Sequence, residues 1–406
     1  MTWTPDPLGE GFYQRYLELH DDQYGPNRAA LVTYRPDWSG DEVPDEALSE
    51  PAESDEAGAD GGIAGGASGG VTSAGSTDAP SAAGRGTASA AEGRKPSFAL
   101  LAVHGWNDYF YHYEFAQRVA EASGRFYALD LRKYGRAHME GQMWGYVEDL
   151  STYDEEIGEA LDVIYDAHGL DVPLFLYGHS TGGLTATLWA DRHPGVLHGL
   201  ILNSPWLELQ AATAVRHLGQ PILDALHKMA PTAVLPSYDN GFYQRLVTGW
   251  MSEEEREQAK KLQEEAGIAD EEVDPFVREG GWNPNPEFRQ FPSFPIRPGW
   301  LRAILHGHER VAEGLTIDCP VLVLTSGKTY YSDTWDAEMR NADTVLDVEQ
   351  IWKRVPRLGP VTTLVKLEGA IHDVLLSRAS VRDVAYWHMK AFTTAFTSPD
   401  RPNNPR

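Results

Sequence analysis

A chain of 406 residues with 60 acidic and 34 basic side chains has a formal net charge of −26, which argues against a nucleic-acid backbone or an anionic membrane surface as its main partner. Its single cysteine, Cys319, excludes an intrachain disulfide and a metal site built from several thiolates. The sequence shows neither a basic region followed by an apolar run at its start nor an apolar stretch of transmembrane length, so we expect a cytoplasmic protein without an integral membrane segment.

Two strands are predicted near the start of the chain, at residues 13–20 and 29–34. The segment between them contains Gly25, Pro26 and Asn27, which favour a chain reversal, so the two strands should form an antiparallel pair. From residue 39 to residue 94 the composition changes to Gly, Ala, Ser, Asp and Glu with almost no large apolar side chain. Such a segment cannot bury enough surface to offset the entropy of ordering, so we predict a disordered low-complexity insertion. A tolerated loop insertion is the preferred interpretation, and binding of a partner is the alternative.

Strands and helices then alternate along the chain, beginning with the apolar run at residues 98–103. This alternation predicts an α/β fold with a mostly parallel central sheet and helices on both faces. Further strands are predicted at residues 125–131, 174–177, 196–203, 320–326 and 361–369, and helices at residues 113–123 and 152–168, with another beginning at 184–190.

The interval 204–315 interrupts this alternation and shows no convincing strand pattern. Residues 252–267 predict a strongly charged helix that opens with a capping box of Ser252 and Glu255. We therefore predict a helical cap inserted into the core, whose aromatic residues either line a substrate pocket or pack the cap onto the core. A second helical face is formed by Leu218, Ile222, Leu226 and Met229. The predicted organisation is core strands at 1–38, the insertion at 39–94, core at 95–203, cap at 204–315, core at 316–396 and a flexible tail at 397–406.

The stretch from Leu174 to Ala190, LFLYGHSTGGLTATLWA, joins a buried strand to a helix through a tight glycine-rich turn. Ser180 lies at the apex of that turn. Gly178 and Gly182 allow the close backbone contacts that expose a serine hydroxyl at a strained strand-to-helix turn. The pattern predicts a nucleophile elbow with Ser180 as the nucleophile, whereas a glycine-rich loop that merely caps a helix is the structural alternative.

A serine hydroxyl needs a base, and the base needs an orienting acid. His372 follows the last predicted strand, where a loop at the edge of the sheet can hold its imidazole against Ser180. Asp343 is the preferred acid because it lies on a loop before a helix begins. Asp347 resembles the cap of that helix, and Asp333 is the other alternative.

The developing oxyanion needs backbone N–H donors. One donor is the amide of Thr181, the residue after the nucleophile. The second is the amide of Trp106, which follows His104 and Gly105 at the end of an apolar strand.

With HGWND, GHSTGG, ADTVLD and GAIHD in this order, the chain resembles the α/β-hydrolase superfamily, in its branch of monoacylglycerol lipase-like proteins, lysophospholipases and serine aminopeptidases. The resemblance extends from about Tyr13 to Phe396, apart from the low-complexity insertion. It implies the α/β-hydrolase fold and a triad in the order serine, acid, histidine. This chain departs from the family in the long segment before Asp343, in the charged helix at 252–267 and in the insertion at 39–94.

The preferred function is hydrolysis of a small or lipid-like carboxylic ester without a cofactor or metal. A serine aminopeptidase is the second hypothesis, since cap carboxylates at 253–255 or 270–274 could bind a substrate amine. A non-catalytic binding protein on the same fold is the third. A metal-dependent hydrolase is disfavoured because His306 and His308 point apart on a helix. The sequence leaves the oligomeric state open.

Overall fold

The computed structural model describes residues 2–38, 95–209, 223–237, 239–267 and 281–398. The predicted disordered insertion and most of the predicted tail lie outside the described residues. Nine strands form one sheet in the order β1-β2-β3-β5-β4-β6-β7-β8-β9. The strands are β1 (Thr4–Pro5), β2 (Phe12–Asp22), β3 (Gly25–Tyr34), β4 (Phe98–Val103), β5 (Gly124–Asp130), β6 (Leu174–His179), β7 (Gly199–Asn203), β8 (Val321–Ser326) and β9 (Thr362–Leu367).

The first three strands and β5 pair antiparallel, and all the remaining pairs from β5 to β9 are parallel. This confirms the predicted opening hairpin and the mostly parallel sheet. The hairpin turn is tighter than predicted, because Asp22 already pairs with Gly25. Oδ1 of Asp22 accepts a hydrogen bond of 2.7 Å from the amide of Tyr24, and Gly25 has a φ of +121°. The aspartate side chain thus stabilises a turn that is shorter than the loop predicted from the sequence.

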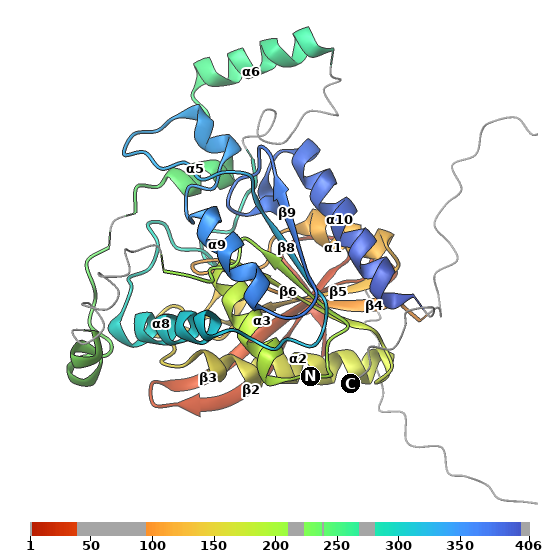
Figure 1. The fold of residues 1–406 in the computed structure, drawn as a ribbon, viewed down its shortest axis with the longest axis vertical. Coiled ribbons are helices and arrows are strands. Elements are labelled where there is room, and N and C mark those ends of the chain that lie inside the picture. Colours follow the sequence, from red (N-terminus) through yellow and green to blue (C-terminus); the bar gives the residue numbers. More distant parts are fainter. Residues whose placement is uncertain (1, 39–94, 210–222, 238, 268–280, 399–406) are drawn as a thin grey trace, which may run out of the picture. The chain divides into compact units, whose positions relative to one another are not determined.

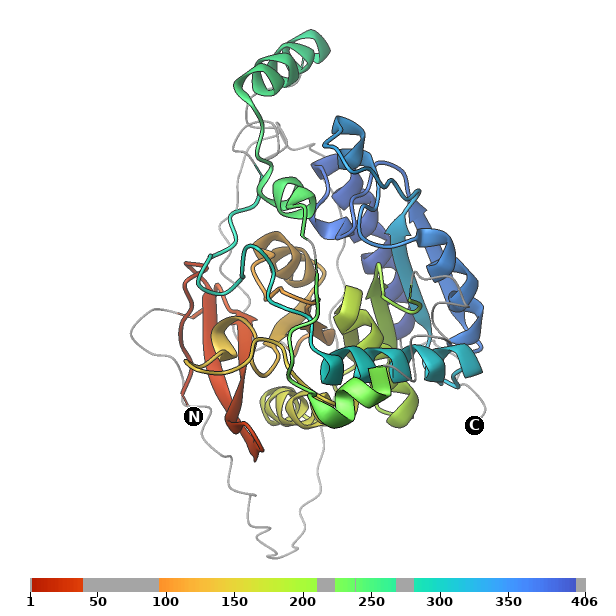
Figure 2. The same ribbon diagram turned by 90° about the vertical axis from the view of Figure 1, so that its left-hand side faces the viewer.

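Helices cover both faces of the sheet (Figures 1 and 2). Successive side chains of β6 alternate between two hydrophobic cores, with Leu174 and Leu176 in one and Phe175 and Tyr177 in the other. The first core is closed by α2, α3, α8 and α9, and the second by α1 and α10. The helices are α1 (Tyr113–Glu121), α2 (Asp154–His168), α3 (Ser180–Arg192), α5 (Phe242–Thr248), α6 (Glu253–Ala266), α8 (Pro298–Glu313), α9 (Val348–Arg354) and α10 (Ala379–Thr397).

The described part of the interval 204–315 contains helices and no strand. The predicted charged helix is α6, and its capping box of Ser252 and Glu255 is formed. Residues 223–229 are helical, as predicted, but Leu226 and Met229 on the predicted apolar face are exposed. Leu218 and Ile222 lie outside the described residues. The proposed domain boundaries stay predictions.

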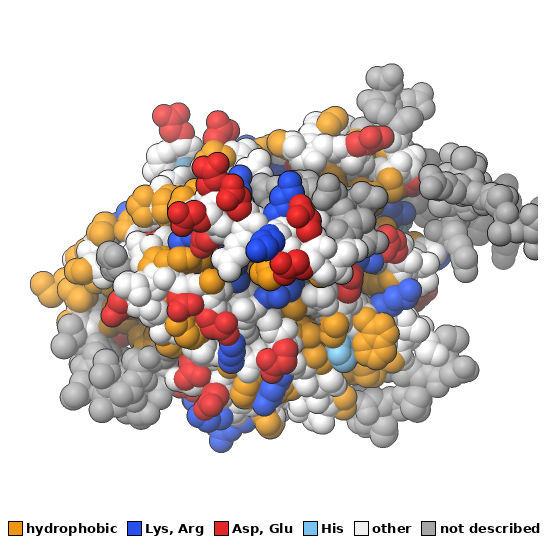
Figure 3. All heavy atoms as spheres, turned by 90° about the horizontal axis from the view of Figure 1, so that it is seen from above, with side chains coloured by type: hydrophobic (Ala, Val, Ile, Leu, Met, Phe, Trp, Pro, Cys, Tyr) orange, Lys and Arg blue, Asp and Glu red, His pale blue; other side chains and the backbone are white. Residues whose placement is uncertain are grey.

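The cap helices differ in how they meet the core. No side chain of α6 is buried, whereas Leu246 and Val247 of α5 are buried in a cluster with Tyr109 and Ile371. Seen from the side that carries α6, acidic side chains are interspersed with Lys and Arg and with apolar patches (Figure 3). None of the helices in the described ranges combines the length and the apolar character that a membrane span requires.

Candidate functional site

The predicted elbow is a sharp strand-to-helix turn. Strand β6 ends at His179, and α3 begins directly at Ser180, four residues before the position predicted from the sequence. Ser180 has a φ of +53°, a left-handed conformation that is rare for a residue other than glycine. A Cβ atom on Gly178 would lie 2.5 Å from the carbonyl oxygen of Gly182, and one on Gly182 would lie 2.1 Å from that of His104. Both glycines are therefore required by close backbone contacts around the serine.

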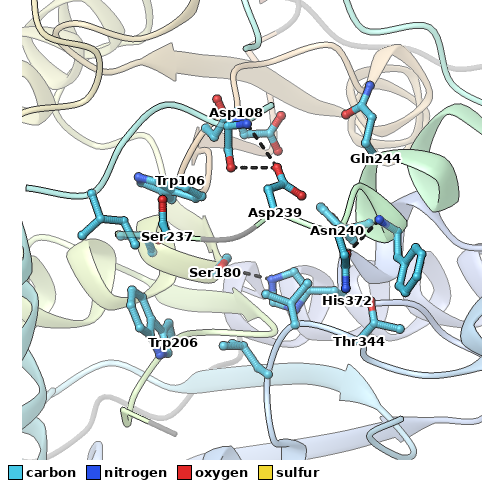
Figure 4. A pocket seen from close by; sticks show the side chains of 18 of the residues that line it. Trp106, Asp108, Ser180, Trp206, Ser237, Asp239, Asn240, Gln244, Thr344 and His372 are labelled. Carbon is cyan, nitrogen blue, oxygen red and sulfur yellow. Dashed lines mark hydrogen bonds between the residues drawn. The ribbon is translucent and has the colours of Figure 1, made fainter. Parts of the chain in front are cut away.

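Ser180, His372 and Asp343 form one continuous chain of hydrogen bonds. Oγ of Ser180 lies 3.0 Å from Nε2 of His372 (Figure 4), and Nδ1 of His372 lies 2.9 Å from Oδ2 of Asp343. Because an ionised carboxylate only accepts hydrogen bonds, Nδ1 of His372 donates to Asp343 and Nε2 is left to accept the proton of Ser180. All three side chains are buried or nearly so, with exposed fractions of 9%, 2% and 0% for Ser180, His372 and Asp343.

Asp343 is oriented by its own backbone neighbours. Its Oδ1 accepts hydrogen bonds of 2.8 and 2.7 Å from the amides of Val345 and Leu346, which leaves Oδ2 for His372. The two alternative carboxylates have other surroundings. Asp347 is the N-cap of α9 and accepts from the amide of Glu349 at 3.0 Å, as its sequence position indicated. Asp333 is exposed at the rim of the pocket.

The loop after β4 runs directly beside the elbow. A Cβ on Gly105 would lie 3.1 Å from Cβ of Ser180, so a larger residue would push this loop away from the serine. His104 is buried and holds the loop at two points. Its Nε2 accepts from the amide of Leu131 at 3.1 Å, so its Nδ1 carries the proton that is donated to the carbonyl oxygen of Gly105 at 2.7 Å. Trp106 and Thr181, the two predicted oxyanion donors, both line the pocket that contains Ser180.

The pocket has a volume of about 890 Å³ and an aromatic wall. The ring centroid of Trp106 lies 4.9 Å from that of Phe294 and 6.0 Å from that of Trp300, and Trp300 lies 6.3 Å from Trp206. Phe294 and Trp300 come from the Pro-rich part of the interval 204–315. Phe294 is buried in the core, whereas Trp300 is buried there and also lines the pocket, so the cap aromatics do both of the things that the sequence left open.

Three pocket residues were not identified from the sequence. The ring of Tyr243 on α5 lies 5.5 Å from that of His372 in an edge-to-face arrangement, and burial raises the pKa of its phenol well above the ordinary value. Arg289 is buried, with Nε donating to the carbonyl oxygen of Asn107 at 3.2 Å. Asp239 accepts from the amides of Gly241 and Ser293. No motif marks these residues, which reach the pocket only because the cap folds over the loop after β4.

A second group of buried polar side chains adjoins the hydrogen-bonded chain. The ring centroid of His179 lies 5.0 Å from that of His372. Burial lowers the pKa of His179 to about 3, so its imidazole is neutral at pH 7. Burial works against ionisation of Asp373, but hydrogen bonds from the side chain of Asn203 and the amide of Leu375 help to bring its pKa below the ordinary value. Asp108, in contrast, has its pKa raised by burial despite the nearby Arg289.

Comparison with known proteins gives one family model and several relatives. Residues 94–278 match the family model described as serine aminopeptidase, S33. This match includes Ser180 but ends before Asp343 and His372. The chain is 31% identical over 119 residues to phospholipase YtpA of Bacillus subtilis, covering 29% of this chain and 43% of that protein. It is 29% identical over 136 residues to the human monoglyceride lipase, covering 32% of this chain and 42% of that protein. The matches thus span less than half the length of either relative.

A solved structure extends the likeness to nearly the whole chain. The carboxyl esterase from Bacillus coagulans superposes with a TM-score of 0.53 and 14% identity, covering 95% of this chain and 99% of that one. At this identity the likeness concerns the fold. Together with the mostly parallel sheet and the strand-to-helix elbow, these findings show the α/β-hydrolase fold, and the matched part of the sequence is similar to the serine aminopeptidases and monoglyceride lipases.

Proposed function

We propose that the protein is a serine hydrolase that cleaves a carboxylic ester through an acyl-enzyme intermediate. The observation that carries the proposal is the chain of hydrogen bonds from Ser180 through His372 to Asp343, at 3.0 and 2.9 Å. The strained φ of +53° at Ser180 supports it, because such strain is typical of a nucleophile that must project from the end of a sheet.

In the proposed reaction, Oγ of Ser180 attacks the ester carbonyl while Nε2 of His372 takes the serine proton. The carboxylate of Asp343 stabilises the resulting imidazolium without accepting its proton. The amides of Thr181 and Trp106 are the proposed donors to the oxyanion. His372 then returns the proton to the leaving alcohol. A water molecule, activated by the same imidazole, attacks the acyl-serine and releases the carboxylic acid.

The pocket supports an ester with an apolar acyl group. Trp106, Trp300 and Trp206 line the pocket together with Ser180, with ring centroids 6.0 Å apart for Trp106 and Trp300 and 6.3 Å apart for Trp300 and Trp206. A volume of about 890 Å³ lies in the range of about 300–1,000 Å³ that is typical of small-molecule sites. The names of the curated relatives, phospholipase and monoglyceride lipase, agree with a lipid-like substrate for this chain.

A fluorophosphonate probe tests the nucleophile. The probe should label the wild-type protein, and Ser180→Ala should abolish both labelling and turnover of a p-nitrophenyl ester. Ser237→Ala is the matched control, because Ser237 lines the same pocket but has no place in the proposed reaction. Undiminished labelling of Ser180→Ala would overturn the proposal and point to a different nucleophile, whereas a wild-type protein that the probe does not label would favour a binding protein.

An aminopeptidase is the second candidate, supported by the described family model and by one pocket carboxylate. Asp239 lines the pocket and is held as an anion: burial opposes ionisation, but the amides of Gly241 and Ser293 lower its pKa overall. The predicted cap carboxylates contribute less. Glu255 is paired with Arg245, and residues 270–274 lie outside the described part of the chain.

Substrates of the two kinds separate the candidates. Esters of graded acyl length should be hydrolysed with a higher kcat/KM than an N-terminal proline anilide. The reverse order, together with a loss of anilide turnover in Asp239→Asn, would establish the peptidase instead. Glu253→Gln serves as the control for the loss of a cap carboxylate, because Glu253 is exposed on α6.

A further inference from the structure

Three buried side chains converge from the three segments that carry the proposed reaction. Asp108 lies on the loop after β4, two residues after Trp106. His179 is the last residue of β6 and directly precedes Ser180. Asp373 directly follows His372 in the loop after β9. Their exposed fractions are 4%, 3% and 0%, so water competes little with any ligand held between them.

The ligating atoms of these residues are close together. One oxygen of each carboxylate and one imidazole nitrogen all lie within 4.8 Å of one another. Nδ1 of His179 lies 3.7 Å from Oδ2 of Asp373, and Nε2 of His112 lies 3.5 Å from the same oxygen. Two ligands of a tetrahedral zinc ion, each at about 2.0 to 2.1 Å, are separated by about 3.3 Å. Small side-chain shifts would thus bring these atoms to bonding distance.

The facing atoms lack hydrogen-bond partners. Oδ1 of Asp108, both ring nitrogens of His179 and Oδ2 of Asp373 are buried without a hydrogen bond among the described residues. The other oxygen of Asp373 is, in contrast, held firmly: Oδ1 accepts from Nδ2 of Asn203 at 2.7 Å and from the amide of Leu375 at 2.9 Å. Asp373 is thus fixed through Oδ1, while its Oδ2 faces His179 and Asp108. This is the arrangement expected of a metal ligand.

The charges also favour a cation. Two buried carboxylates meet here, and among the described residues Arg289 pairs with one of them, its Nε lying 3.9 Å from Oδ1 of Asp108. Arg289 already donates to Asn107 and Tyr111. Two buried carboxylates with little positive charge beside them are costly, so a further positive charge between the two acids would be stabilising.

We propose that Asp108, His179 and Asp373 bind one divalent transition-metal ion, with His112 as the adjacent fourth ligand. Imidazole and carboxylate together suit Zn²⁺ and its first-row neighbours, whereas Ca²⁺ prefers six to eight oxygen ligands. The ion has a route of entry, because Asp108 and His179 also line the pocket. The single cysteine and the pair His306 and His308, which disfavour other kinds of metal site, do not concern these residues.

The ion would be structural. It would join the loop that carries Trp106, the strand end that carries Ser180 and the loop that carries His372, and so fix their separation. The Ser180–His372 contact itself uses none of the ligating atoms. The site is therefore independent of the proposed reaction, and Ser180→Ala should bind the ion as the wild-type protein does.

Zinc binding to the full-length protein tests the proposal. After chelator treatment and dialysis, the wild-type protein should bind one Zn²⁺ per chain, and its Tm should rise by about 4 °C when free Zn²⁺ exceeds its Kd about 100-fold. Asp373→Asn keeps an oxygen for Asn203 and Leu375 but removes the carboxylate. The affinity of this variant for Zn²⁺ should fall by more than the roughly 10- to 100-fold that is lost when a residue hydrogen-bonded to a metal ligand is removed. Asp333→Asn, at the rim of the same pocket, should bind normally.

A wild-type protein that binds no stoichiometric Zn²⁺, or an Asp373→Asn variant that binds it unchanged, would overturn the proposal. His179→Gln provides an independent removal of one ligand, with circular dichroism as the check on folding. If neither variant folds, the wild-type protein loaded with Co²⁺ decides the question. The proposal is supported if the Co²⁺ protein shows the visible d–d bands of a site with nitrogen and oxygen ligands and one equivalent of Zn²⁺ removes them. It is refuted if the spectrum is that of aqueous Co²⁺.

Discussion

Asp343 pairs with Thr329 through an isolated parallel bridge, although residues 330–342 lie between them in the chain. The amide of Asp343 donates to the carbonyl oxygen of Lys328 at 2.9 Å, and the amide of Tyr330 donates to that of Asp343 at 2.9 Å. The chain thus leaves the end of β8, makes an excursion and returns to the same place. The segment before Asp343 is longer than in the family pattern, but the carboxylate of Asp343 still lies beside the end of β8.

The excursion is held against the cap. Trp335, at its outer part, lies under the guanidinium of Arg245, 3.7 Å from the ring centroid, and donates from Nε1 to Glu255 at 3.3 Å. Arg340 also pairs with Glu255 at 3.7 Å. Glu255 therefore has two functions, as the capping residue of α6 and as the ionic link between cap and excursion.

The position of Asp343 predicts a large effect of removing its charge. Asp343→Asn should lower kcat for ester hydrolysis by about 10⁴-fold, because an amide at this position favours the wrong His372 tautomer and cannot stabilise the imidazolium. Asp347→Asn should leave kcat and stability nearly unchanged, because asparagine is an equally good N-cap. Steady-state kinetics of the two variants check this, and a loss of similar size in Asp347→Asn would reassign the acid.

The backbone contact at Gly182 predicts a loss of stability on adding one methyl group. In Gly182→Ala the new Cβ would lie 2.1 Å from the carbonyl oxygen of His104 and 2.7 Å from that of Val103, and backbone atoms cannot move aside freely. We expect the free energy of unfolding to fall by about 3 kcal/mol. Gly158→Ala in α2, where a Cβ meets nothing within 4 Å, should instead raise it by about 0.5–1 kcal/mol. Urea denaturation of both variants distinguishes crowding at the elbow from a general intolerance of alanine.

A buried ion cluster ties the N-terminal segment to the core. Arg136 donates to Asp6 at 2.6 and 2.9 Å and to Asp130 at 2.8 Å, and all three side chains are buried. Arg136→Met would leave two buried carboxylates without their partner, so we expect a loss of about 3–5 kcal/mol in unfolding free energy. The matched control is Arg192→Met, which breaks the partly exposed pair with Asp154 and should cost less than about 1 kcal/mol. Equal losses in chemical denaturation would contradict this difference.

His168 predicts part of the acid sensitivity of the fold. Burial, with Arg125 and Arg35 nearby, lowers its pKa from 6.5 to about 4, and its Nε2 lies 2.8 Å from Oη of Tyr127. Between pH 6.5 and pH 4 the unfolded chain therefore binds a proton that the folded protein does not. Stability should fall as the pH decreases through this window. His168→Gln cannot titrate, so its unfolding free energy should decline less steeply between pH 7 and pH 4.5; parallel curves for the two proteins would show that His168 contributes nothing.

Several features followed from local sequence patterns. Alternating apolar strands and amphipathic helices predicted the mostly parallel sheet, because hydrophobic periodicity is set by neighbours in the chain. Gly178 and Gly182 predicted the strand-to-helix turn around Ser180, because this glycine pattern is also local in the chain. Ser180 and His372 were chosen from their positions after strands, and the structure brings their side chains within 3.0 Å; their catalytic roles stay predictions.

Other features depended on contacts between distant parts of the chain. The sequence offered three neighbouring carboxylates as the acid. Only the return of the excursion to Thr329 puts Asp343, and neither Asp333 nor Asp347, against His372. Asp108, His179 and Asp373 are likewise separated by whole strands and helices, and Arg289 reaches the pocket from the cap. Local periodicity cannot specify such groupings, because they form only when loop closure and packing bring remote segments to the same end of the sheet.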